Sequence, residues 1–154
     1  MPGGFGICGI EGKIQAVRHA REMQIPYFGI CLGMQVAVIE YARYVLGHAD
    51  ANSTEFAADT KHPVICLLED QKTVTHKGAT MRLAPRRVSW RRIRWRRVVT
   101  AYRRSASGTG IGMNSIRNTA TQRIGAGLSL SGLSPDGRLV EIVEIPEHPW
   151  FLAV

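Results

Sequence analysis

The sequence predicts an α/β fold with a parallel sheet, and three observations support this prediction. Residues 26–30 are typical of a short buried strand, and residues 32–46, apolar on most faces, are typical of the buried helix that follows it. An earlier segment, 11–24, has the apolar spacing of a helix with one solvent-facing side. Helix, strand and helix in this order are typical of parallel α/β sheets.

The remaining elements follow from local chemistry. A glycine-rich loop at 2–6 lets backbone N–H groups turn toward an anionic group. Residues 64–68 are a short apolar run, which predicts another strand. A Pro-Asp-Gly turn at 135–137 separates two apolar runs and predicts a β-hairpin, and a further apolar strand begins at Trp150.

Cys31 lies at the centre of the most informative motif, Gly29-Ile30-Cys31-Leu32-Gly33. A cysteine between a strand and a helix, with glycines two residues before and after, is the thiol counterpart of a nucleophile elbow. The helix dipole and the unpaired N–H groups there favour the reactive thiolate. A lone cysteine between apolar segments is also typical of a small buried side chain, and the spacing alone does not separate the two.

Charge is distributed very unevenly along the chain. Residues 71–135 hold 14 Lys and Arg and no Asp or Glu, whereas the rest holds 6 Lys and Arg and all 12 acidic residues. The three cysteines are too few and too scattered for a disulfide framework or a metal cluster. With no secretory leader and no membrane-length apolar run, we expect a cytoplasmic protein without a membrane partner.

Five segments are informative together: 2–6 (PGGFG), 9–13 (GIEGK), 29–38 (GICLGMQVAV), 50–56 (DANSTEF) and 134–141 (SPDGRLVE). With them the chain resembles the glutamine amidotransferase domain of the CTP synthase family. The strand-to-helix motif alone fits any class I amidotransferase, whereas segments 50–56 and 134–141 are more specific to CTP synthases. The resemblance covers residues 2 to about 82 and about 127 to 154.

The resemblance implies a partial flavodoxin-like amidotransferase sheet and the chemistry of the family. Members hydrolyse L-glutamine with a Cys-His-Glu triad and pass the ammonia to a synthetase domain that converts UTP to CTP. The implied partners are L-glutamine and that synthetase domain, and the family is homo-oligomeric. ATP, UTP and Mg would bind the synthetase domain, which lies outside the resemblance, so no cofactor or metal is expected in this chain.

The resemblance also assigns roles to individual residues. Cys31 matches the nucleophile. Backbone N–H groups of Gly4 and Leu32 would form the oxyanion hole. Glu55 would hold the substrate's α-amino group. The glutamine pocket would be lined by Leu32, Gly33, Met34 and Gln35.

The triad histidine and glutamate of the family belong to the segment that follows the strand begun by residues 150–154. His148 resembles an ordinary loop histidine of the family and is not a substitute for the general base. Without that base, proton transfer to the leaving ammonia is lost. We therefore expect an inactive fragment.

The basic segment has two interpretations. Arg82–Arg104 contains ten arginines interleaved with Trp90, Trp95 and Tyr102, a composition that also suits nucleic-acid binding. The preferred hypothesis is translation out of frame from about Leu83 to about Gly125.

The codons of residues 108–116 allow a test of the frameshift. Read from their third bases, they permit His-Arg-His-Arg-Tyr-Glu-Phe-Asn, which is the family's string at this place. The hypothesis divides the chain into an amidotransferase part (1–83), a disordered basic segment (84–125) and a C-terminal hairpin and strand (126–154), and it makes nucleic acid an unlikely partner.

Overall fold

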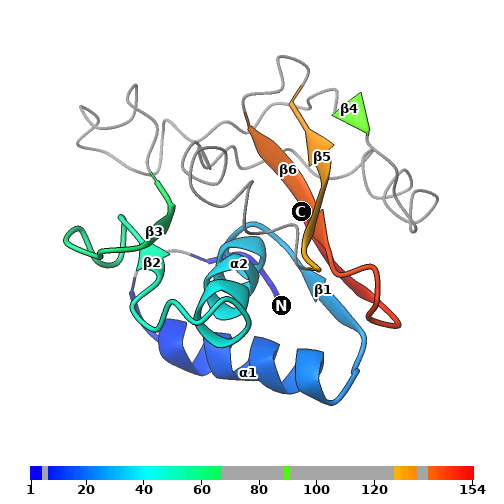
Figure 1. The fold of residues 1–154 in the computed structure, drawn as a ribbon, viewed down its shortest axis with the longest axis horizontal. Helices are drawn as coiled ribbons and strands as arrows, with labels where there is room; N and C mark the ends of the chain where they lie inside the picture. The colour runs from blue at the N-terminus through cyan, green and yellow to red at the C-terminus, as the bar shows by residue number, and fades with distance from the viewer. Residues whose placement is uncertain (5–6, 67–88, 91–126, 135–138) are drawn as a thin grey trace.

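The computed structural model describes residues 1–4, 7–66, 89–90, 127–134 and 139–154. These residues form two helices and two sheets, and Figure 1 shows their arrangement. The elements in chain order are α1 (Ile10–Glu22), β1 (Tyr27–Gly29), α2 (Leu32–Tyr44), β2 (Asn52–Ser53), β3 (Pro63–Ile65), β4 (Ser89–Trp90), β5 (Ser129–Leu133), β6 (Val140–Glu144) and β7 (Phe151–Ala153).

The larger sheet has the strand order β1-β7-β6-β5-β4. β1 and β7 are parallel, whereas β7, β6, β5 and β4 pair antiparallel in turn. The predicted α/β class and the predicted hairpin (β5–β6) are therefore confirmed. The sheet is mixed rather than wholly parallel, because short connections join β5 to β6 and β6 to β7, with no room for a crossover helix. β2 and β3 form a separate parallel pair.

The two helices bury different shares of their surfaces. α1 buries only Ile10, Ile14, Val17 and Ala20, the stripe that its apolar spacing predicts, and leaves its charged residues partly or fully exposed. Every residue of α2 from Leu32 to Ala42 is buried. Figure 1 shows why: α2 lies between the β2–β3 pair and the five-stranded sheet, with α1 across its side.

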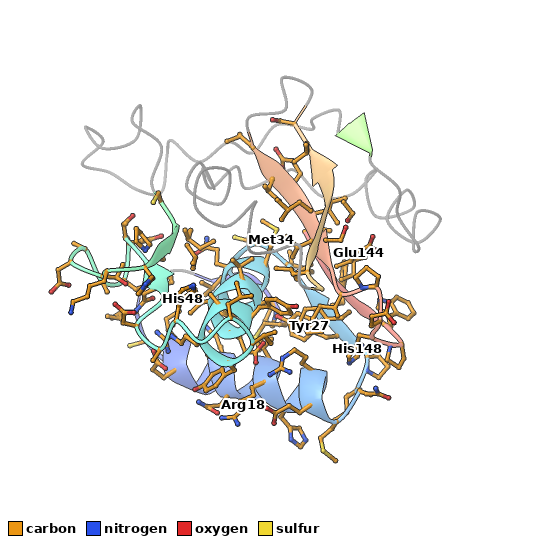
Figure 2. The ribbon with its side chains drawn as sticks, viewed as in Figure 1. Arg18, Tyr27, Met34, His48, Glu144 and His148 are labelled. Atoms are coloured by element: carbon orange, nitrogen blue, oxygen red, sulfur yellow. The ribbon has the colours of Figure 1, made fainter. Side chains whose placement is uncertain are left out.

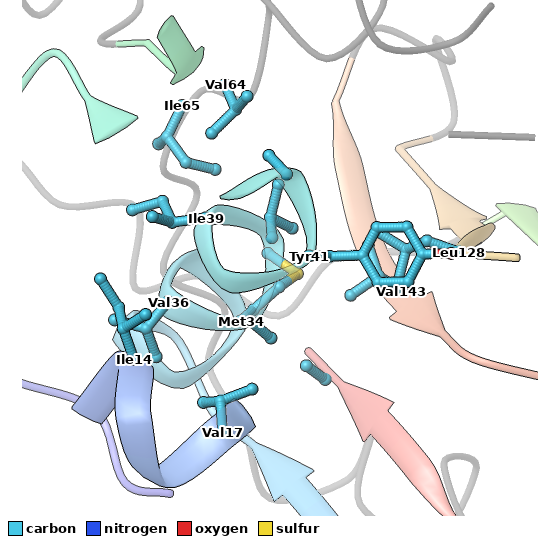
Figure 3. Packing of buried hydrophobic residues seen from close by; sticks show 14 of the residues in the cluster. Ile14, Val17, Met34, Val36, Ile39, Tyr41, Val64, Ile65, Leu128 and Val143 are labelled. Carbon is cyan, nitrogen blue, oxygen red and sulfur yellow. The ribbon is translucent and has the colours of Figure 1, made fainter. Parts of the chain in front are cut away.

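The hydrophobic core surrounds α2. Ile14 and Val17 of α1, Val64 and Ile65 of β3, and Val143 of β6 all belong to one cluster with the apolar residues of α2 (Figure 3). Burying each such aliphatic side chain contributes about 1.5–3 kcal/mol relative to leaving it in water. The position of α2, and of Cys31 at its start, is therefore set by packing from several directions.

A buried ion pair joins the two helices. The Arg21 guanidinium donates to both carboxylate oxygens of Glu40, with distances of 2.7 and 3.0 Å. The Glu40 side chain is 0% exposed and that of Arg21 is 19% exposed. Burial raises the pKa of Glu40, and the contact with Arg21 opposes that rise.

α1 ends in a tight turn with an unusual residue at its centre. The N–H of Ile25 donates to the carbonyl of Ala20 (2.9 Å) and that of Gln24 to the carbonyl of Arg21 (3.4 Å), the hydrogen bonds of a Schellman motif. Gln24 has φ 54°, a conformation that glycine adopts without strain.

We expect Gln24→Gly to raise the free energy of unfolding by about 1 kcal/mol, since it removes the left-handed strain of a side-chain-bearing residue. Urea denaturation would measure the change. Gln24→Ala is the matched control, because alanine keeps the strain, and it should stay close to wild type. An equal gain for alanine would contradict this explanation.

Several sequence predictions fall outside the described residues. Apart from the two residues of β4, these are the basic segment 84–125, most of Arg82–Arg104, the frameshift with its boundaries, the Pro-Asp-Gly turn at 135–137 and the last two residues of the predicted strand 64–68. They stay predictions. In the part of the chain that is described, neither helix has the length and apolar character that a membrane crossing requires.

Candidate active site at the Cys31 elbow

Cys31 joins β1 to α2 in a strained backbone conformation. Its φ of 55° and ψ of −107° lie where side-chain-bearing residues are rare, and such a conformation costs about 1–3 kcal/mol. The residue is the N-cap of α2, and its side chain is buried. Strain of this kind at a cysteine on a strand-to-helix turn is the backbone feature of a nucleophile elbow.

The two flanking glycines are required by close approach of the backbone. A Cβ on Gly29 would lie 2.9 Å from the carbonyl carbon and oxygen of Gly33, and one on Gly33 would lie 2.7 Å from the carbonyl oxygen of Met1. Both separations are shorter than real Cβ contacts. The glycine spacing in the motif therefore reflects contacts inside the turn.

Segments from both ends of the described chain hold the elbow. The N–H of Cys31 donates to the carbonyl of Val154 (2.7 Å), and the N–H of Ile30 donates to the carbonyl of Met1 (3.0 Å). The buried Tyr27 hydroxyl donates to the carbonyl of Gly33 (2.8 Å), and burial raises the pKa of this hydroxyl. The two residues that follow β1 are thus bonded to both ends of the described chain, and Tyr27 joins β1 to the first turn of α2.

The described part of the glycine-rich loop, residues 2–4, lies against the elbow. A Cβ on Gly3 would lie 3.4 Å from the Cβ of Cys31 and 3.8 Å from its Sγ, and one on Gly4 would lie 3.2 Å from Cδ2 of Leu32. The N–H of Leu32 makes no backbone hydrogen bond to any described residue, unlike those of Cys31 and Gly33 on either side. It is therefore a candidate donor to an anionic oxygen beside the sulfur.

The other predicted pocket residues divide into two groups. Leu32 and Met34 belong to the hydrophobic cluster, and Figure 2 shows Met34 at the centre of the molecule. Gln35 is 1% exposed, and its Oε1 accepts no hydrogen bond from the described residues. A buried amide oxygen normally has a donor partner, so a ligand donor at this position would stabilise it.

Glu55 lies in the turn that follows β2. Its N–H donates to Oγ of Ser53 (3.2 Å), and its side chain is partly exposed. β2 and β3 both contact α2, the helix that Cys31 caps. The structure thus brings Gly4, Cys31 and Leu32 together and places Glu55 on a segment that packs along the same helix.

Three of the four described histidines have partners of their own, and the fourth, His19, is exposed on α1. His148 is buried; its Nε2 lies 3.2 Å from the carbonyl oxygen of Ala20, and its Nδ1 accepts the N–H of Trp150. His48 stacks on His62, and Figure 2 shows His48 and His148 on opposite sides of the molecule. His148 is thus a structural residue of the turn before β7. Among the residues that can be described, no group of three metal-ligating side chains occurs.

Sequence reasoning missed three features of the elbow. The Val154 and Met1 carbonyls act through the backbone, so no residue type signals them. Tyr27 lies two residues before Gly29, so its hydroxyl can reach Gly33. From the sequence, however, an aromatic residue in an apolar strand is first assigned to the hydrophobic core. Gly3 as well as Gly4 packs against the elbow. Two adjacent glycines do not show which of them lies next to Cys31 until the position of the loop is known.

Comparisons with known proteins agree with this geometry. The family model "Glutamine amidotransferase class-I" matches residues 1–154. The chain is 52% identical over 154 residues to a CTP synthase of Syntrophus aciditrophicus, covering 99% of this chain and 28% of the relative. It is 50% identical over 158 residues to a CTP synthase of Clostridium acetobutylicum, covering 100% of this chain and 29% of the relative.

A solved structure gives the same result. The glutaminase domain of Trypanosoma brucei CTPS, with bound acivicin, matches with a TM-score of 0.76 and 35% identity over 99% of this chain and 60% of that one. The chain spans less than a third of the length of these curated relatives. From these matches, the chain belongs to the class-I glutamine amidotransferase family and corresponds to part of the amidotransferase domain of CTP synthases.

Proposed function

We propose that this chain carries the glutamine-binding and nucleophile half of a glutaminase that supplies ammonia to a CTP synthase. The observation that carries the proposal is the strained conformation of Cys31 at the N-terminus of α2, with Gly3 and Leu32 against it. A backbone strained at a thiol, supported by two constrained glycines, is best explained by a reaction at that sulfur.

The reaction begins with attack on the glutamine side-chain amide. Sγ of Cys31 forms a bond to the amide carbon, and the carbonyl oxygen takes the negative charge, which the N–H groups of Leu32 and Gly4 stabilise. The C–N bond then breaks, and ammonia leaves with a proton delivered by a general acid. Water attacks the thioester, the C–S bond breaks, and glutamate is released with the thiol restored.

Two further residues would bind the substrate. The buried Oε1 of Gln35 would accept a hydrogen bond from glutamine, and the carboxylate of Glu55 would pair with its α-ammonium. In the family, the general base follows the strand that corresponds to β7. The position of Val154, the residue after β7, supports such an arrangement. Its carbonyl oxygen lies 2.7 Å from the backbone nitrogen of Cys31, so the chain leaves β7 beside the elbow.

The experiment is covalent labelling of Cys31. A chloromethyl ketone analogue of L-glutamine should alkylate Cys31 and leave the exposed Cys8 unmodified, since recognition of the amino acid places the electrophile at the elbow. Peptide mass spectrometry would locate the label. We expect Cys31→Ala to lose essentially all labelling, and Cys8→Ala, the control, to keep it.

Two outcomes would contradict the proposal. One is labelling of Cys8 in preference to Cys31; the other is equal labelling by the D-enantiomer of the analogue. For the 154 residues alone we expect labelling without measurable release of ammonia from glutamine, because three of the described histidines have other partners and the fourth, His19, is exposed on α1. Sustained release would contradict that expectation.

The alternative of nucleic-acid binding rests on Arg82–Arg104, of which only Ser89 and Trp90 are described. Nothing in the described part of the chain favours it.

A further inference from the structure

The loop from Asp50 to His62 is closed at its base by side chains. Oδ1 of Asp50 pairs with Nδ1 of His62, and Oδ2 accepts the N–H of Lys61 (3.2 Å). The Thr60 hydroxyl donates to the carbonyl of Asp50 (2.6 Å) and accepts the N–H of His62 (3.3 Å). The first and last residues of the loop are thus held together by a network centred on Asp50 and His62.

The network is continued on both sides. The ring of His48 stacks on that of His62, with 4.4 Å between centroids. The carbonyl of His62 accepts the N–H of Asn52, the first residue of β2 (3.2 Å). The contact with His62 is the main cause that lowers the pKa of Asp50. The pair is therefore connected to both strands that border the loop.

Glu55 lies inside this closed loop. The carbonyl of Ser53 accepts the N–H groups of Phe56 (3.0 Å) and Ala57 (2.9 Å), and the N–H of Thr54 donates to the carbonyl of Ile65 on β3 (2.9 Å). The turn is thereby fixed to β3, whose start is fixed by His62. A shift at the base of the loop would move Glu55 with it.

A second anchor lies at the other side of the loop base. Nε of Arg43 donates to the carbonyl of Ala51 (2.7 Å), and its Nη1 pairs with the carboxylate of Glu11 (2.8 and 3.0 Å). This contact ties the residue after Asp50 to α1 and α2. Arg43 thus holds the first side of the loop, at Ala51, and the Asp50–His62 pair holds the last side, at His62, in place against it.

We propose that Asp50 and His62 are positioning residues for glutamine, which fix the base of the loop so that Glu55 meets the substrate's ammonium. This inference rests on the proposed function. Neither residue touches the substrate in this account. Both side chains are exposed, at 45% and 42%, and exposed pairs contribute little to global stability. The effect of breaking the pair should therefore appear in substrate affinity and not in folding.

The test follows the labelling of Cys31 by the chloromethyl ketone of L-glutamine at increasing concentration, which separates the half-saturating concentration from the maximal rate. For Asp50→Ala and His62→Ala we expect the half-saturating concentration to rise about three- to fivefold, with the maximal rate within about twofold. Labelling by iodoacetamide, which needs no amino-acid recognition, should be unchanged. Amide hydrogen exchange at residues 52–56 should be faster in both variants.

The control is Asp59→Ala, which removes an exposed carboxylate from the same loop and should leave every readout at wild type. Asp50 and His62 variants with unchanged half-saturation and unchanged exchange would overturn the inference alone. If the analogue fails to label wild-type Cys31 while iodoacetamide labels it, the proposed function fails and this inference fails with it.

Discussion

Arg21→Met is expected to lower the free energy of unfolding by about 3–5 kcal/mol, the typical result of removing one partner of a buried ion pair. Methionine retains much of the apolar contact of the arginine stem but leaves the Glu40 carboxylate, which is fully buried, without its cation. Urea denaturation monitored by circular dichroism would measure the loss.

The deficit of Arg21→Met should depend on pH. Without Arg21, burial is the largest remaining influence on Glu40, with smaller opposing contributions from Glu22 and Arg18, so its folded-state pKa rises further above the ordinary value of 4.5. A folded-state pKa above the unfolded one means that stability falls as pH rises between the two values. The loss of unfolding free energy in Arg21→Met should therefore be largest above the folded-state pKa that Glu40 has in the variant, and it should shrink as pH falls toward 4.5.

Arg18→Met is the matched control, one helical turn away on α1. Arg18 pairs with Glu22, but these side chains are 40% and 45% exposed, and it also lies over the Tyr44 ring. Such an exposed pair contributes little to stability, because water screens both charges. A loss for Arg18→Met as large as that for Arg21→Met, or a deficit at Arg21 that does not change with pH, would show that the buried pair is not the cause.

Gly29→Ala is expected to disrupt the elbow itself. The new methyl group would lie 2.9 Å from backbone atoms of Gly33 and from Cε1 of Tyr27, and neither can move without shifting α2 or the Tyr27 ring. We expect a loss of about 1–3 kcal/mol in the free energy of unfolding from overpacking. Labelling of Cys31 by the glutamine analogue should slow by at least about tenfold, because the sulfur is displaced from its position.

Gly12→Ala is the control for Gly29→Ala. A Cβ on Gly12 meets no atom within 4 Å, and the residue lies inside α1. Alanine in a helix is favoured over glycine by about 1 kcal/mol, so this variant should be more stable than wild type and labelled at the same rate. Wild-type labelling of Gly29→Ala would contradict the steric account of the elbow.

The sequence predicts the elements whose patterns are local. The helix over 11–24 and the strand over 26–30 are confirmed as α1 and β1, within one or two residues, because apolar spacing and glycine placement act within a few residues. The mixed strand order is not predictable in the same way. The position of β7 between β1 and β6 depends on contacts between residues more than 100 positions apart, such as Tyr27 and Phe151.

The site shows the same division. The motif around Cys31 identifies the turn, and its two glycines are the residues that the turn geometry requires. The Arg21–Glu40 pair has no local sequence pattern. A glutamate among the buried residues of α2 breaks the apolar pattern, and only its partner on another helix explains it. The contact of Asp50 with His62 likewise depends on the path of the loop between them.

The hydrogen bonds of β1 to Met1 and to Val154 have a consequence for folding kinetics. Three parts of the chain, separated by about 30 and by more than 120 residues, must meet before Cys31 can adopt its conformation. Contacts of such high order form late and slowly, because the loops they close cost entropy before they stabilise anything. During refolding, Cys31 should therefore become reactive toward the glutamine analogue only when the native topology is complete, well after α1 and α2 have formed.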